Sequence, residues 1–139
     1  MSQTEDRKAL TARFLDEWDE GLVTTLTTNA PVQDVNEKKA FVRFSVNFGS
    51  SFVTTLGNGG EREQIGRVTL QIFTPRGTGD KQSHVLVDQF IAIFADWRSD
   101  DGRLTSGRNS SIDTQLIDNP NDLWLQHKVT VPFQSFRSA

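Results

Sequence analysis

A short segment of the chain places glycines and a lysine in an order that suits phosphate binding. The segment PRGTGDKQS, residues 75–83, joins an alternating apolar run to a long amphipathic pattern. Backbone N–H groups at a helix N-terminus form a general anion site. The Walker pattern G-x-x-x-x-G-K-[ST] needs lysine directly after its second glycine and a hydroxyl after the lysine. Here Asp80 separates Gly79 from Lys81, and Gln82 stands in the hydroxyl position.

The turn is better explained as a structural corner between a strand and a helix. Asp80 is placed to accept hydrogen bonds from the same N–H groups that a phosphate would need. The dinucleotide pattern G-x-G-x-x-G also fails, because no third glycine follows Gly77 and Gly79. We therefore predict no nucleotide and assign a structural role to the turn. Its residues are Pro75, Gly77, Gly79 and Asp80.

Other side chains that could do chemistry are sparse. The sequence has no cysteine and two histidines, His84 and His127, which form no H-x-x-x-H pair. Alternation predicts His127 inside a sheet, while His84 falls in the first turn of a helix, at the surface. No G-x-S-x-G elbow occurs, but a serine or threonine nucleophile stays open because a triad is defined by geometry. We predict a protein without catalytic activity, cofactor or metal.

Composition limits the class of protein further. The 139 residues are 35% hydrophobic and 24% charged, so we expect one folded domain over residues 1–139. The net charge is −3 and no basic run exceeds two residues, which disfavours a nucleic-acid-binding patch. Polar residues interrupt the longest apolar cluster, residues 85–97, so no membrane span is expected. The polar, acidic N-terminus is unlike a secretory signal, which favours the cytosol.

Apolar spacing predicts a helix over residues 4–20. Leu10, Phe14 and Trp18 recur every four residues, and Thr4 is a suitable N-cap. Carboxylates crowd the other end, where the helix dipole disfavours negative charge. They are Asp16, Glu17, Asp19 and Glu20. Two interpretations stay open: a solvated acidic face, or a surface that meets cations of a neighbouring chain.

Strict alternation of apolar and polar residues predicts the strands. They cover residues 41–48, 65–74, 111–117 and 123–133. Pro75 ends the second of these strands, because proline has no N–H to donate. Between the first two strands, the glycine-rich residues 49–66 predict a long mobile hairpin arm or loop rather than core.

A second helix and a polar loop follow the glycine turn. We predict the helix over residues 80–97, with a broad apolar arc that packs on a sheet. The arc consists of Leu86, Phe90, Ile93, Phe94 and Trp97. The polar composition of residues 98–111 predicts a loop. The fold class is therefore α+β, a single antiparallel-rich mixed β-sheet with two main helices on one face and an extended glycine-rich hairpin arm or loop.

Residues 66–94, GRVTLQIFTPRGTGDKQSHVLVDQFIAIF, resemble the central segment of tail terminator (tail completion) proteins of long-tailed bacteriophages. In that family a strand ending in a QIFTPxGxG turn leads into a helix that ends in an IF pair. The similar positions are Val68, Gln71, Phe73, Pro75, Gly77, Gly79, Phe90, Ile93 and Phe94. The later LWLQHKVTVPFQ resembles the family's last strand, through Trp124, Val129, Pro132 and Phe133. The early FLDEW is similar to part of its first helix.

The resemblance implies a virion structural protein without cofactor or catalysis. Six copies would form a ring on the last ring of the tail tube, stop tube growth and offer a docking surface to the head-side connector. It would be found at the head-proximal end of the tail, after assembly in the host cytoplasm, with DNA only passing through the lumen. Two alternatives stay open: another neck or head-completion protein, or a small ligand-binding domain or hydrolase with a pocket near His127 or the 75–80 turn.

In a ring, one patch on each copy meets a different patch on the next copy. Charged and apolar residues at the predicted surface indicate where these two patches lie. The acidic end of the first helix could meet Lys38, Lys39 or Arg43 of a neighbour. Residues 49–66 and 99–111 are expected to carry partner specificity. The candidate contacts are Asp16, Glu17, Asp19, Glu20, Lys38, Lys39, Arg43, Phe52, Val53, Leu56, Arg76, Arg103 and Arg108.

Overall fold

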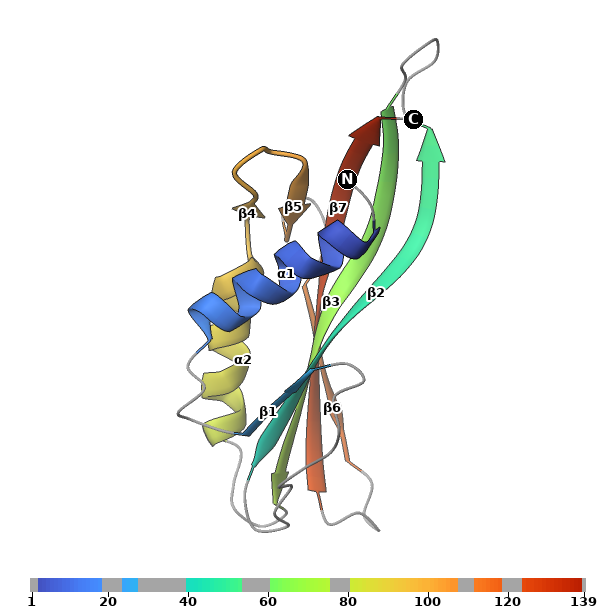
Figure 1. The fold of residues 1–139 in the computed structure, drawn as a ribbon. Coiled ribbons are helices and arrows are strands. Elements are labelled where there is room, and N and C mark those ends of the chain that lie inside the picture. The colour runs from blue at the N-terminus through green and yellow to red at the C-terminus, as the bar shows by residue number, and fades with distance from the viewer. Residues whose placement is uncertain are drawn as a thin grey trace.

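The computed structural model describes residues 3–18, 24–27, 40–53, 61–75, 81–107, 112–118 and 124–138. Their elements are α1 Gln3–Glu17, β1 Thr24–Thr27, β2 Phe41–Val53, β3 Glu61–Pro75, α2 Lys81–Phe94, β4 Trp97–Arg98, β5 Leu104–Ser106, β6 Asp113–Ile117 and β7 Trp124–Ser138. One mixed sheet carries both helices on the same face (Figure 1). The predicted α+β class is therefore confirmed.

Three long antiparallel strands, in the order β2-β3-β7, form the centre of the seven-stranded sheet. β1 pairs with β2 in parallel. On the other side of the sheet, β5 pairs with residues 133–135 of β7 and β4 pairs with β5, whereas β6 pairs with residues 126–130 of β7. β3 is central and pairs with β7 from Glu61 to Pro75. It ends at Pro75, as the missing proline N–H predicts.

The core lies between the sheet and the two helices. Phe14 of α1 stacks on Phe44 of β2 with ring centroids 4.3 Å apart, and Phe94 of α2 lies 6.0 Å from the same ring. Burial of each such ring contributes about 1.5–3 kcal/mol. Around them, every second residue of the central strands is buried: Val42, Val68, Leu70, Ile72, Val129, Val131 and Phe133. The alternation in the sequence therefore identified the buried face.

The helix boundaries differ from the predicted ones. α1 begins at Gln3, so Thr4 lies inside the helix and is not its N-cap. α2 ends at Phe94, because Asp96 adopts the left-handed backbone conformation with a φ of 51°. Trp97 therefore belongs to β4 rather than to the helix, although its ring still contacts Phe94. The prediction of a helix reaching residue 97 was wrong at this end.

The predicted polar loop 98–111 contains buried structure that closes the end of α2. Leu104 and Ser106 of β5 are buried, and the Ser106 hydroxyl donates to the carbonyl of Phe94 at 2.6 Å. The next residue, Gly107, has a φ of 63°, and a Cβ there would lie 2.8 Å from that carbonyl oxygen. β5 therefore satisfies one of the free carbonyls at the helix end, and the loop prediction was wrong for these residues.

The predicted loop 49–66 is also partly strand. β2 runs to Val53 and β3 begins at Glu61, whereas residues 54–60 lie outside the description. A bulge interrupts the β2–β3 ladder between Phe48 and Ser51. Buried Gln64 donates through its amide to the Gly49 carbonyl at 2.8 Å, which the bulge removes from the ladder. We call residues 49–53 and 61–66 the arm.

Candidate interaction surfaces

The sheet face opposite the helices presents polar and cationic side chains. Cross-strand register aligns Arg43, Gln71 and Lys128 in one row across β2, β3 and β7. A nearby row pairs Asn47 with Arg67. No helix of the described residues lies on this side (Figure 1). We call it the open face; its central residues are Arg43, Ser45, Asn47, Arg67, Gln71, Gln126, Lys128 and Thr130.

The central residues of the open face include cations but no carboxylates. The chain has 18 acidic residues, yet none occurs in 41–53, 64–75 or 124–138. Among the described residues, Arg43, Arg67 and Lys128 form no salt bridge. Within the described ranges, the nearest carboxylates are on the arm and on β6, where Asp113 pairs with Thr130 and lies diagonal to Lys128. Cations that form no salt bridge within the described part of the chain suit an acidic partner.

An aromatic cluster closes one end of the open face. Phe41 and Phe73 stack with ring centroids 4.6 Å apart, and Trp124 meets Phe41 edge-on at 5.0 Å. Phe73 and Trp124 keep part of their surface exposed. Partly exposed aromatic residues are enriched at protein interfaces. The cluster extends the candidate surface beyond the cations.

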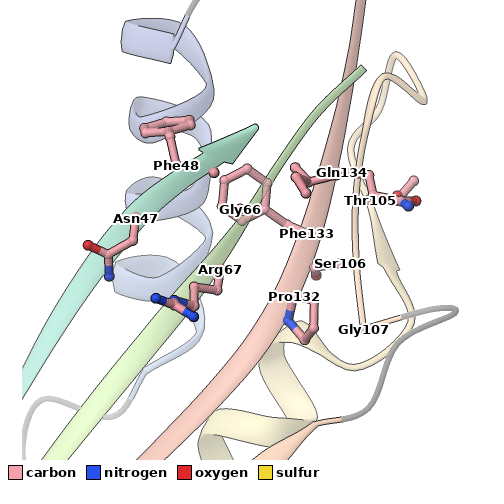
Figure 2. Close-up of a pocket in the computed structure, with 12 residues that line it drawn as sticks. Asn47, Phe48, Gly66, Arg67, Thr105, Ser106, Gly107, Pro132, Phe133 and Gln134 are labelled. Carbon is pink, nitrogen blue, oxygen red and sulfur yellow. The ribbon is translucent and has the colours of Figure 1, made fainter. Parts of the chain in front are cut away.

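A hollow of about 330 Å³ opens where β2, β3, β7 and β5 meet. Figure 2 shows Asn47 and Arg67 on neighbouring strands beside it, with Gly66 next to the ring of Phe133. A Cβ on Gly66 would lie 2.5 Å from that ring and equally close to the Asn47 carbonyl oxygen. Glycine is therefore required at the root of the arm, where the ring packs directly on the backbone.

A second hollow, of about 490 Å³, lies between α1 and β2. It is lined by Thr4, Arg7, Lys8, Thr11, Ala12, Leu15, Phe44 and Val46. Its walls combine basic and apolar side chains, and Leu15 is exposed.

The C-termini of both helices lie at one corner of the molecule. Arg13, one turn before the end of α1, donates to the carbonyl of Ile93, one residue before the end of α2. Neither helix has a basic residue in its last turn. Asp16 and Glu17 are exposed there, and Glu17 lies 3.3 Å from Arg13. Since helix C-termini carry partial negative charge, we call these two residues and the two helix ends the acidic corner.

The structure places the described members of the predicted contact set on different surfaces. Asp16 and Glu17 form the acidic corner, Arg43 lies on the open face, and Phe52 is 43% exposed on the arm. Arg103 is exposed beside β5. Val53 is in β2, but its side chain lies outside the description. The remaining predicted residues also lie outside it: Asp19, Glu20, Lys38, Lys39, Leu56, Arg76, Gly77, Gly79, Asp80 and Arg108.

The sequence analysis missed Arg67 and Lys128. Both lie on the open face with Arg43, at positions where strand alternation puts polar side chains. A count of charge for each strand face would have found them, because these strands carry cations without carboxylates. Conversely, the structure does not bring Arg43 together with Asp16 and Glu17 within one chain, since the sheet separates them (Figure 1).

The two histidines meet, which the sequence did not predict. The rings of His84 on α2 and His127 on β7 are 5.6 Å apart with an interplanar angle of 66°. His127 is buried and His84 is exposed, as their positions predicted. Neither histidine lines the two hollows. The described residues contain no group of His, Cys, Asp or Glu side chains suited to a metal ion.

The turn between β4 and β5 holds a carboxylate in a structural role. The Ser99 hydroxyl donates to Asp101 Oδ1 at 2.7 Å, and the Arg103 N–H donates to the same oxygen at 3.1 Å. These bonds, the one from Ser99 first, hold the pKa of Asp101 below its ordinary value. A carboxylate stabilised in its charged form is a poor general acid, so Asp101 fixes the turn.

The helices within the described ranges include none that is long and apolar enough to cross a membrane.

Comparison with known proteins establishes the fold but no family. No family model and no curated protein matches the chain. A solved structure of a protein that carries no functional name is similar, with a TM-score of 0.65 and 14% sequence identity. The similarity covers 97% of this chain and 96% of that one. At this identity the likeness concerns the fold alone, and function has to be argued from the surfaces.

Proposed function

We propose that the chain is a virion structural protein that forms a hexameric ring on the tail tube of a long-tailed bacteriophage. The ring stops polymerisation of the tube and provides the docking surface for the head-side connector. The resemblance of residues 66–94 and 123–134 to tail terminator proteins motivates the proposal. Its partners are other copies of the chain, the tail tube protein and the connector, and DNA only passes through the lumen.

The observation that carries the proposal is the arm. β2, β3 and β7 run past the helix layer (Figure 1). Because Phe52 pairs with Glu63, it lies on the same side of the arm as Ile65, and both are exposed. Apolar side chains held at the end of paired strands suit contact with another protein. The resemblance to tail terminator proteins points to a tube or connector subunit as the partner of this surface.

The residues that carry the resemblance support this reading by their positions. Val68, Phe90 and Phe94 are buried in the core that joins β3 to α2. Phe73 and Trp124 belong to the aromatic cluster of the open face. These five residues belong to the sheet and the helix that support the arm. Their structural role is consistent with a fold shared with tail terminator proteins.

The test is to mix the protein with purified tail tubes and to image the tube ends by electron microscopy. We expect a ring at one end of each tube and no further growth when free tube subunits are added. Binding along the tube wall, or no binding, would contradict the proposal. Binding to tail-less heads at the portal, with no binding to tubes, would instead favour a head-completion protein.

A further inference from the structure

We infer that neighbouring copies in the ring meet through two different surfaces: the acidic corner of one copy docks on the open face of the next. The inference rests on the proposed function, because it specifies how the ring closes. It extends the charge hypothesis drawn from the sequence by replacing the single cation Arg43 with a defined surface that also includes Arg67 and Lys128.

The dimensions of the open face suit the end of a helix. Arg43 and Lys128 lie in the same cross-strand row on β2 and β7, with Gln71 of β3 between them. Two strand spacings separate their backbones by about 10 Å, close to the 10–12 Å diameter of a helix with its side chains. The C-terminal turn of α1 can therefore lie between the two cations, with amide and hydroxyl groups of the face beneath it.

The charges of the two surfaces are complementary, and each is poorly compensated among the described residues. Asp16 and Glu17 stand at the helix end that their own dipole makes unfavourable for anions. Arg13 offsets this negative charge only in part, because its guanidinium donates to the Ile93 carbonyl as well as pairing with Glu17. On the open face, no described carboxylate pairs with the cations. Contact between copies supplies the missing counter-charge on both sides.

The positions of the surfaces favour a ring over a dimer. The acidic corner belongs to the helix layer, whereas the open face is on the other side of the sheet (Figure 1). A contact between two different patches is head-to-tail and repeats until the rotation closes. A two-fold dimer through the open face would instead place cations against cations, which is unfavourable.

Charge reversal tests the interface. Asp16→Lys and Lys128→Glu should each weaken self-association roughly tenfold or more in low salt, since like charges across an interface repel. The double variant, Asp16→Lys with Lys128→Glu, should regain association because the pair re-forms with exchanged signs. Asp88→Lys and Lys81→Glu are the matched controls, because both residues are exposed on α2 away from the two surfaces. Sedimentation velocity measures association, and circular dichroism checks that each variant is folded.

A zero-length carbodiimide cross-link gives an independent readout. Mixed isotope-labelled and unlabelled wild-type protein should yield an inter-chain peptide that joins Asp16 or Glu17 to Lys128. Unchanged association of both single variants, or no recovery in the double variant, overturns the inference. A wild-type protein that stays monomeric in low salt and on tube ends also overturns it, as does an open face that binds duplex DNA without self-association.

The outcomes separate the interface from the proposed function. If charge-reversed variants still cap tubes as the wild type does, the interface is wrong and the function stands. If the charge-dependent ring forms but never binds tubes, the interface stands and the proposed function is wrong.

Discussion

Arg13 of α1 donates two hydrogen bonds to the Ile93 carbonyl of α2, from Nε at 3.2 Å and from Nη2 at 3.1 Å. The same guanidinium lies 5.7 Å from the ring centroid of Trp97. One side chain thus closes the C-terminal end of α2, ties the two helices together and contacts the strand that follows. The planar guanidinium of arginine can donate two hydrogen bonds and stack near a ring at the same time, whereas the compact ammonium of lysine cannot.

Replacement of Arg13 should therefore destabilise the fold. Arg13→Ala should lower the free energy of unfolding by about 1.5–3 kcal/mol, the usual range for hydrogen bonds that involve a charged group. Arg13→Lys should recover only part of the loss, because the ammonium cannot make both bonds and the ring contact. Urea denaturation measures the difference. Glu17→Gln is the control: its exposed ion pair should contribute less than about 1 kcal/mol.

Gly66 should not tolerate a side chain. Gly66→Ala should destabilise the protein by about 1–3 kcal/mol, because the new methyl group overlaps the Phe133 ring and the Asn47 carbonyl. Gly49→Ala is the matched control, since its Cβ would meet Ile65 at an ordinary distance of 3.4 Å. Thermal unfolding compares the two variants. Equal melting temperatures would show that the ring does not pack on the strand as described.

The turn held by Asp101 should respond to acid. The folded pKa of Asp101 lies below its ordinary value of 3.8. The carboxylate therefore stabilises the turn fully above the unfolded pKa, and this stabilisation is lost as the pH falls through the folded pKa. Amide NMR signals of Arg103 and Leu104 should shift in this acidic range. Ser99→Ala should move the titration of Asp101 back towards its ordinary value; an unchanged midpoint would rule out the Ser99 bond as the main cause.

Phe52 should be needed for docking but not for folding. Phe52→Ser removes an exposed ring from the arm and should weaken binding to tail tubes roughly tenfold, a loss of about 1.4 kcal/mol. Val85→Ser provides the comparison, because Val85 is 51% exposed on α2 and away from the arm. Binding of labelled protein to tube ends gives the affinities. Equal effects of the two substitutions would indicate that the arm is not a contact surface.

The sequence predicted the parts of the fold that follow from regular periodicity. Val68, Leu70 and Ile72 alternate with polar residues, and this pattern identified both the central strand and its buried face. Trp97 was misassigned for the same reason, because it continues the helical spacing of Phe90 and Phe94. The left-handed conformation of Asp96 ends the helix, and periodicity carries no information on that.

The surfaces were harder to predict than the core. Gln64 sits in a glycine-rich segment, yet its buried amide holds a bulge that only long-range pairing produces. Arg67 and Lys128 are 61 positions apart in the chain, and strand pairing alone brings them to one face. Asp16 and Glu17 were singled out correctly as exposed, since they conflict with a local rule, the helix dipole.

The bulge has a consequence for how β2 tolerates a change in its length. Before the bulge, Phe44, Val46 and Phe48 all point towards the helices, and an uninterrupted strand would carry Phe52 to that same side. The offset between Phe48 and Ser51 reverses the parity and turns Phe52 outwards. Loss of the codon for Ser50 would remove the extra residue and with it the bulge, while Phe52 would still lie opposite Glu63 and face outwards. One residue between Phe48 and Ser51 can therefore be lost without changing which side chains the tip displays and without disturbing the hydrophobic interior.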